Sequence, residues 1–188
     1  VMNSLGIAAV ISEVADDRDQ AIQALSQVQP LKGRGRRSRV HLPGGGDFLV
    51  IDESYNASPA AMKAALEVLA QAQPGPGGRR IAVLGDMLEL GTDGPALHAG
   101  LAATIEQTGT DMVFTAGPLM AHLDDALRDS CPHSHGADSN ALITPVIDAV
   151  RDGDVFMVKG SLGSRMAPVV DALLALDTPN GEETRHAV

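Results

Sequence analysis

Short apolar runs alternate with longer amphipathic segments through most of the chain, and this alternation constrains the fold more than any other feature. The apolar runs are predicted to be strands and cover residues 48–52, 81–84, 112–115 and 155–158. The segments between and after them are predicted to be helices and cover residues 59–72, 95–108, 118–129, 140–151 and 164–176. Strands without polar alternation are typical of parallel sheets covered by helices on both faces. The sequence therefore predicts an α/β fold with a Rossmann-like, largely parallel, doubly wound sheet.

Three further segments complete the predicted organisation. RSRVHL and FLVIDE flank the glycine-rich GGGD, which predicts a β-hairpin at the N-terminal edge of the sheet. A short strand is also expected at residues 133–137. Residues 1–30 have helical spacing, with Asp16 or Asp17 as the N-cap of a second short helix, and we interpret them as a helical appendage cut from something longer. The domain proper is expected at residues 31–177, followed by a flexible tail at 178–188.

Charge and composition exclude several classes of function. The formal net charge of -10 argues against general nucleic-acid binding, because nucleic acids are bound mainly through their phosphates. No run approaches the ~18–20 apolar residues that a membrane span needs, so we expect a cytoplasmic protein without a membrane partner. Cys131 is the only cysteine, which rules out an intramolecular disulfide. Five of the 14 Lys and Arg residues nevertheless lie within residues 32–39, a cluster that suits a small anion such as a nucleotide.

Polar residues follow the first parallel strand in the stretch DESYNASP at residues 52–59. In parallel sheets, ligands gather at the carboxyl ends of the strands, where helix N-termini present free amides. The final Ser-Pro of the stretch is explained by helix initiation alone. Asp52, Glu53, Tyr55 and Asn56 are not, and they are candidates to contact a ribose, a phosphate or an amine.

A second polar stretch, IAVLGDMLELG, follows the next strand along the chain. Gly85 permits a sharp exit from the strand and places Asp86 and Glu89 in the loop above the sheet. Equally, Asp86 can be a helix cap and Glu89 a solvated side chain. His98 further on is more often a packing or surface histidine than a functional one.

The third stretch, VFMVKGSLGSRM, gives the strongest candidate for an anion site. Its strand delivers Lys159 and Ser161 to a loop, and a helix is expected to begin at Ser164 or Arg165. Two cations beside a helix N-terminus suit a carboxylate or a phosphate. The alternative is an exposed lysine and a helix cap.

Several familiar motifs are missing from the 188 residues. None of the three lysines lies in G-x-x-x-x-G-K-[ST], so the chain has no P-loop, and no G-x-G-x-x-G follows a strand. Cys131, His133 and His135 lie close together beside a proline, but such a group is usually a plain loop, and no metal site is predicted.

Taken in order, four stretches resemble the C-terminal part of the Mur ligases. They are KGRG at residues 32–35, DESYNASP, VLGDMLELG with His98 after it, and VKGSLGSRM at residues 158–166. VMNSLGIAA, at residues 1–9, is similar to the helix that ends the central domain of the family. Within the family, the chain looks most like the members that join D-alanyl-D-alanine to a UDP-N-acetylmuramoyl-tripeptide.

The resemblance implies ligase chemistry in cytoplasmic peptidoglycan synthesis, with ATP and Mg²⁺ as cofactors. ATP would convert a carboxylate to an acyl phosphate, which the amine of the dipeptide then attacks. Such ligases have three domains, of which the central one carries the P-loop. Residues 31–177 would be the third domain and residues 1–30 a remnant of the central one. Without the missing N-terminal and central domains, the chain is expected to be inactive.

The resemblance also suggests roles for individual residues. Asn3 matches a position that contacts adenine, Arg34 one near the nucleotide phosphates, and Glu53 one near the ribose. Residues implied to face the dipeptide or the phosphates are Tyr55, Asn56, Lys159, Ser161 and Arg165, with Asp52, Asp86, Glu89 and His98 as further loop contributors. No residue of the chain is assigned as catalytic.

The chain departs from the pattern of the family at three positions. Glu53 stands where Asp is usual, Ser58 where Asn is common, and Leu162 where Arg is frequent. Two alternatives remain at this point: the C-terminal domain of a folylpolyglutamate synthase, which has the same architecture, and a non-catalytic α/β ligand-binding module.

Overall fold

The computed structural model describes residues 30–128 and 130–178, together with Ala9, Val10, Glu13, Asp17, Asp19, Gln20 and Gln23. The chain divides into two units, Val1–Pro30 and Leu31–Val188. In the first unit, the Asp17 carboxylate accepts a hydrogen bond from the backbone N–H of Gln20 at 3.0 Å, which is the N-cap geometry expected there. The remainder of the predicted helical pair, Asn3 and the tail from residue 179 lie outside the described residues.

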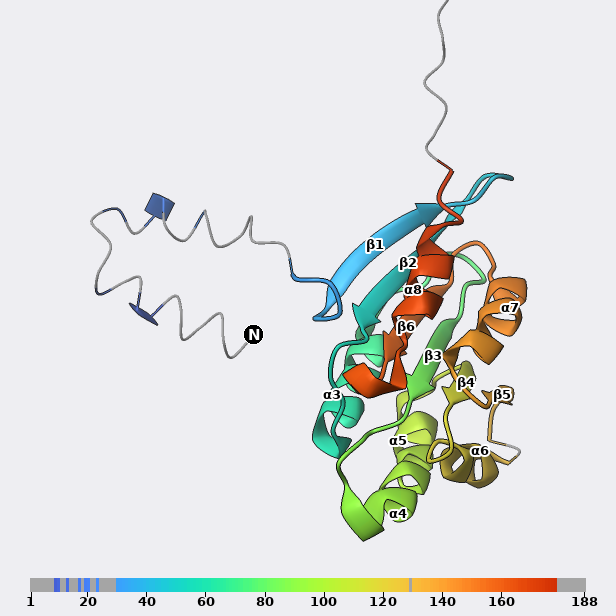
Figure 1. The fold of residues 1–188 in the computed structure, drawn as a ribbon. Coiled ribbons are helices and arrows are strands. Elements are labelled where there is room, and N and C mark those ends of the chain that lie inside the picture. Colours follow the sequence, from blue (N-terminus) through green and yellow to red (C-terminus); the bar gives the residue numbers. More distant parts are fainter. Residues whose placement is uncertain are drawn as a thin grey trace, which may run out of the picture. The chain divides into compact units, whose positions relative to one another are not determined.

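A six-stranded sheet forms the centre of the second unit (Figure 1). Its strands are β1 (Arg36–His41), β2 (Asp47–Glu53), β3 (Arg80–Gly85), β4 (Met112–Ala116), β5 (His133–Gly136) and β6 (Val155–Lys159). They lie in the order β1-β2-β6-β3-β4-β5, with β1 antiparallel to β2 and every other pair parallel. The predicted fold class and hairpin are confirmed, and each predicted strand is correct to within one residue at either end.

Helices and 3₁₀ turns connect the strands. They are α3 (Pro59–Gln71), η1 (Gly91–Asp93), α4 (Gly94–Ala99), α5 (Leu101–Thr108), α6 (Ala121–Leu127), α7 (Ser139–Ala149), η2 (Leu162–Ser164) and α8 (Ala167–Leu174). None of the helices in the described ranges is long and apolar enough to cross a membrane.

Three of the predicted helices differ from those observed, and the one expected at residues 118–129 is shorter, Ala121–Leu127. The prediction of a single helix at residues 95–108 is wrong, because α4 and α5 are separate helices. They are divided at Gly100, whose ψ of -13° departs from helical values. The helix expected from Ser164 or Arg165 begins only at Ala167. Arg165 has a left-handed backbone, with φ of 53°, which a right-handed helix cannot contain.

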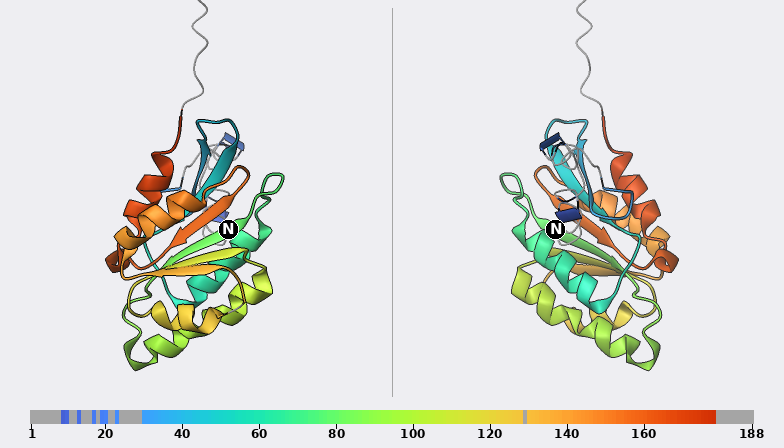
Figure 2. Two further views of the ribbon diagram at one scale, coloured as in Figure 1. Left: turned by 90° about the vertical axis from the view of Figure 1, so that its right-hand side faces the viewer. Right: turned by 90° about the vertical axis from the view of Figure 1, so that its left-hand side faces the viewer.

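The helices cover the two faces of the sheet and create a core on each (Figure 2). On one face, α3, α5 and α6 pack against Ala82 and Leu84 of β3. On the other, α7 and α8 pack against Ile81 and Val83 of the same strand. All four of these β3 side chains are fully buried. Consecutive residues of β3 are thus buried in opposite cores, which is why the central strands are apolar throughout.

The strand order places a topological switch between β3 and β6. The chain leaves β3 toward the face covered by α5, whereas it leaves the neighbouring β6 toward the face covered by α8. Loops that diverge from adjacent parallel strands leave a crevice at the carboxyl end of the sheet, where ligands bind in folds of this kind.

Candidate functional site

A buried carboxylate ties the basic KGRG turn to the carboxyl end of β2. Asp52 is only 4% exposed, and its side chain accepts hydrogen bonds from the backbone N–H of Gly33 at 2.7 Å and from the backbone N–H and hydroxyl of Ser54 at 3.1 and 2.6 Å. Gly33 has φ of 79°, and a Cβ there would lie 2.8 Å from the Cβ of Tyr55. Only glycine fits this approach. The sequence indicated Asp52 as a candidate to contact a ligand, but its carboxylate instead joins the KGRG turn to the residues after β2.

The tied turn places Arg34 over the ring of Tyr55. The guanidinium carbon lies 4.3 Å from the ring centroid, which is cation–π geometry. Tyr55 remains 43% exposed. Lys32 of the same turn forms a 2.8 Å ion pair with Asp171 on α8. The turn thus holds Arg34 at the carboxyl end of β2.

Lys159, at the end of β6, is the most buried cation of the site. It is 3% exposed, and its ammonium donates to the backbone carbonyl of Asn56 at 2.9 Å and lies 3.4 Å from the Glu53 carboxylate. Two of its three N–H donors are therefore used within the described part of the chain. A cavity of about 260 Å³ adjoins it, lined by Gly33, Arg34, Glu53, Tyr55, Asn56, Ala61 and Lys159. Three of the four predicted stretches meet at this cavity.

The loops after β3 and β6 are bonded directly to each other. The backbone N–H of Ser161 donates to the Asp86 carbonyl at 3.0 Å, and the Ser161 hydroxyl accepts from the Leu88 N–H at 3.0 Å. A second cavity, of about 250 Å³, lies beside them and is lined by Tyr55, Asn56, Ala57, Leu88, Glu89, Ser161, Leu162 and Gly163. Glu89 has φ of 64°, an uncommon backbone conformation for a residue other than glycine.

Asp86 and His98 have structural roles in this geometry. The Asp86 carboxylate is buried and accepts from the backbone N–H groups of Met120 at 2.8 Å and Leu119 at 3.4 Å, just before α6. His98 is fully buried, with Nε2 accepting from the Met87 N–H at 2.9 Å and Nδ1 lying 2.6 Å from the Gly94 carbonyl. That pair of partners requires the neutral Nδ1–H tautomer. Asp86 is thus bonded to N–H groups that precede α6 and is not the N-cap of a helix, and His98 lies inside the packed fold.

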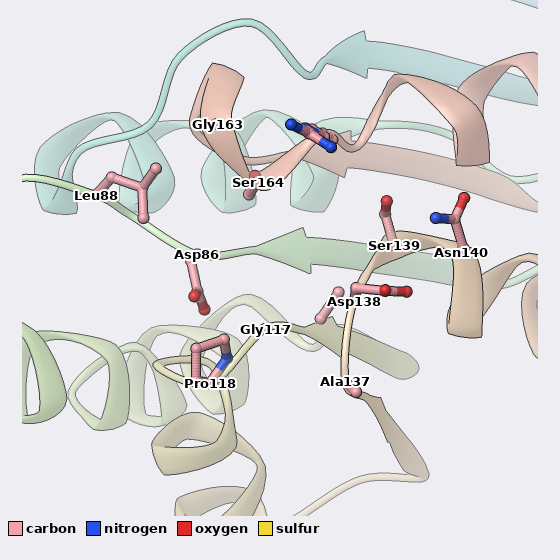
Figure 3. Close-up of a pocket in the computed structure, with 12 residues that line it drawn as sticks. Asp86, Leu88, Gly117, Pro118, Ala137, Asp138, Ser139, Asn140, Gly163 and Ser164 are labelled. Atoms are coloured by element: carbon pink, nitrogen blue, oxygen red, sulfur yellow. The ribbon is translucent and has the colours of Figure 1, made fainter.

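A third cavity, of about 270 Å³, opens where the loops after β3, β4 and β6 meet the start of α7 (Figure 3). Asp86 and Arg165, two of the predicted residues, contribute to its lining. Asp138, Ser139 and Asn140 line it as well, and sequence reasoning missed them. The signal was present, since Asp-Ser-Asn directly after a strand is an N-cap pattern at the carboxyl end of the sheet. The polarity of residues 133–137 obscured it by weakening the strand prediction.

Shifted pKa values lie away from these cavities. Burial raises the pKa of the Cys131 thiol above its usual value. Hydrogen bonding to the backbone and then the side chain of His41 lowers the pKa of Asp177, which follows α8. His133 contacts the carbonyl of Cys131 and His135 contacts Thr115. Among the described residues, no group of three or more His, Cys, Asp or Glu side chains is arranged to hold a metal ion.

Residues 35–162 match a protein family described as the glutamate ligase domain of Mur ligases. This chain belongs to the Mur ligase family. The matched range contains all of DESYNASP and VLGDMLELG and the first residues of VKGSLGSRM. The resemblance noted in the sequence is therefore confirmed. The Mur ligase domain matched here includes β1 through β6.

Curated relatives and solved structures agree with this membership. The UDP-N-acetylmuramoyl-tripeptide–D-alanyl-D-alanine ligase of Mycobacterium tuberculosis (strain H37Rv) is 35% identical over 198 residues, covering 95% of this chain and 38% of the relative. The ligase of the same name from Escherichia coli K12 is 31% identical over 175 residues, covering 92% and 36%. A crystal structure of MurF from Acinetobacter baumannii superimposes with a TM-score of 0.72 at 25% identity, covering 89% of this chain and 35% of that one.

A MurF ligase from Thermotoga maritima, solved in complex with ADP, shares the fold with a TM-score of 0.67 at 23% identity, covering 89% of this chain and 36% of that one. The present chain thus spans a little over a third of the length of these Mur ligases.

Proposed function

We propose that this chain is the C-terminal part of a cytoplasmic, ATP-dependent ligase that adds D-alanyl-D-alanine to UDP-N-acetylmuramoyl-tripeptide in peptidoglycan synthesis. One observation carries the proposal: turns far apart in the chain meet at one end of the sheet. The KGRG turn, the DESYNASP turn and the loops after β3 and β6 are joined there by hydrogen bonds. The curated relatives named above, which match over nearly the whole chain, carry the name of this activity.

Arg34 and Lys159 would stabilise negative charge during the reaction. When bound, ATP supplies the phosphoryl group that activates the tripeptide carboxylate. The buried ammonium of Lys159 is held in place by Asn56 and Glu53, and its third N–H, which has no partner among the described residues, could meet an anion beside the first cavity. A cation that is already desolvated and oriented stabilises a developing negative charge more strongly than one in water.

Glu53 and Tyr55 would position the nucleotide and the guanidinium. Glu53 shares the first cavity with Arg34, so its carboxylate can accept from a ribose hydroxyl while it pairs with Lys159. The ring of Tyr55 lies under the Arg34 guanidinium and would favour its position beside the first cavity. Asn3, proposed to contact adenine, lies outside the described residues.

The remaining domains of the enzyme would supply the main phosphate site and the ligands of Mg²⁺. The sequence contains no P-loop, so we place the main phosphate site in the remaining domains, and this domain would close over it and exclude water. The described residues do not offer a ligand set for Mg²⁺, so its ligands also belong to those domains in this proposal.

Release of ADP by the full-length protein tests the proposal. Sustained, multiple-turnover release of ADP should require ATP, UDP-N-acetylmuramoyl-tripeptide and D-alanyl-D-alanine together. Folate with glutamate in place of the last two should give none, and ADP release with that pair would favour the folylpolyglutamate alternative. Absence of ADP with every substrate set would favour a non-catalytic binding module. The 188-residue chain alone should release no ADP.

A further inference from the structure

His98 is fully buried, and both of its ring nitrogens lie against backbone groups. Nε2 accepts a hydrogen bond from the Met87 N–H at 2.9 Å, and Nδ1 lies 2.6 Å from the Gly94 carbonyl. Gly94 and His98 both belong to α4, whereas Met87 lies 11 positions before His98, near the start of the loop that leaves β3. The imidazole therefore ties the first part of this loop to the helix that follows it.

The next N–H group of the loop is bonded to a different element. The Leu88 N–H donates to the Ser161 hydroxyl at 3.0 Å, and the Ser161 N–H donates to the Asp86 carbonyl at 3.0 Å. Figure 3 shows Asp86 and Leu88, the two neighbours of Met87, on the loop that leaves β3. Two consecutive backbone N–H groups are thus bonded to side chains of α4 and of the loop after β6, which defines the path of the backbone between them.

The residues that follow Met87 are exposed, and one of them has an unfavourable backbone. Met87 is fully buried, whereas Leu88 is 39% exposed and Glu89 is exposed as well. Glu89 has φ of 64°, a conformation that a residue other than glycine keeps only where its surroundings determine it. Leu88 and Glu89 line the second cavity together with Tyr55 and Asn56. The bond at Met87 therefore sets where the exposed part of the loop meets the DESYNASP turn.

A side chain needs an acceptor at the position of Nε2 to bond the Met87 N–H. A neutral imidazole with its proton on Nδ1 presents that acceptor and, at the same time, a donor for the Gly94 carbonyl. An apolar side chain would leave the buried N–H unpaired, which is unfavourable, so the loop would have to move to find another partner. A misplacement of about 1 Å far from the reacting atoms can lower a rate about 100-fold.

We infer that His98 is a positioning residue for the ligation reaction, an inference that rests on the proposed function. His98 acts through the Met87 N–H and not by contact with a substrate. Its Nε2 holds residues 87–89 so that the rim of the second cavity keeps the geometry that the reaction needs. The contact with Gly94 orients the ring and selects the tautomer.

Two amide variants of the full-length enzyme separate the two bonds of His98. The carboxamide of His98→Asn lies where Nδ1 lies in histidine, so it can donate to Gly94 but cannot reach Met87. The carboxamide of His98→Gln extends to the position of Nε2, where its oxygen can accept from the Met87 N–H. His98→Asn should lower kcat/KM for D-alanyl-D-alanine by about 10- to 100-fold, whereas His98→Gln should keep it close to the wild-type value.

His122→Asn is the matched control, because it makes the same change at an exposed histidine on α6. It should leave kcat/KM unchanged. Hydrogen–deuterium exchange followed by mass spectrometry reports on the loop directly, and residues 86–93 should exchange faster in His98→Asn than in the wild type or His98→Gln. The kinetic assays are made where circular dichroism shows each variant to be folded. A histidine with a merely structural role would lower the urea midpoint and leave kcat/KM of the folded enzyme unchanged.

Three outcomes would overturn the inference. One is a folded His98→Asn enzyme with the wild-type kcat/KM. Another is a folded His98→Gln enzyme whose kcat/KM falls by about tenfold or more, because the bond at Nε2 would then not be the one that matters. The third is failure of both variants to fold, which would assign His98 to the stability of the domain alone. All three leave the proposed function intact if the wild type forms product, whereas a wild type that forms none with every substrate present refutes the proposed function.

Discussion

Replacing Asp52 by alanine should destabilise the domain far more than a typical surface substitution. The side chain is buried and accepts three hydrogen bonds, from the Gly33 N–H and from the N–H and hydroxyl of Ser54. Bonds to charged groups contribute about 1.5–3 kcal/mol each but are not additive, so we expect a loss of about 3–5 kcal/mol in the free energy of unfolding. With a slope of about 2 kcal/mol per M, the urea midpoint should fall by about 2 M.

Asp171→Ala is the matched control for this substitution. Asp171 forms an ion pair with Lys32 of the same turn, but both side chains are more than half exposed. Exposed pairs contribute about 0–1 kcal/mol, so the midpoint should move by less than about 0.5 M. Urea titrations of the three proteins, followed by circular dichroism, measure both shifts. Equal midpoints for the two variants would refute the reasoning that the buried carboxylate holds the KGRG turn.

Three further predictions concern the site and its surroundings. In the full-length enzyme, Lys159→Met should lower kcat/KM at least about 100-fold, which is the loss typical of a preorganised electrostatic contact. Lys63→Met, on the exposed side of α3, should leave kcat/KM unchanged. Equal kcat/KM values for the two variants in steady-state assays would remove Lys159 from the site. Because hydrogen bonding from His41 lowers the pKa of Asp177, the carboxylate stabilises the fold fully above its ordinary pKa of 3.8 and ceases to do so as the pH falls through the lowered value. Asp177→Asn should therefore be less stable than the wild type at pH 7 and equally stable in acid, and a pH-independent difference in urea midpoint would contradict this. Because burial raises the pKa of Cys131, iodoacetamide should modify the folded chain at neutral pH much more slowly than the urea-unfolded chain, as mass spectrometry can follow.

The sheet was predictable because its signal is local. Strands such as β3 are apolar on both faces, and the covering helices are amphipathic, so each element is visible in its own residues. The break at Gly100 and the late start of α8 were not visible in the same way. Both depend on the backbone angle of one residue, Gly100 or Arg165, which is set by packing rather than by pattern.

The candidate site was predictable only in part, for a related reason. Lys159, Tyr55 and Arg34 follow strands or lie in distinctive motifs, so their gathering at one end of the sheet follows from the topology. The distinction between a ligand contact and a structural bond needs coordinates. Asp52 has the same position in the sequence pattern as a ligand residue, yet its oxygens are already engaged by Gly33 and Ser54.

Mass spectrometry of the product tests the central claim most directly. The full-length protein, incubated with ATP, UDP-N-acetylmuramoyl-tripeptide and isotopically labelled D-alanyl-D-alanine, should yield a UDP-linked pentapeptide that carries the label. Lys159→Met should yield almost none under the same conditions. A wild-type protein that leaves the labelled dipeptide entirely unincorporated would contradict the account.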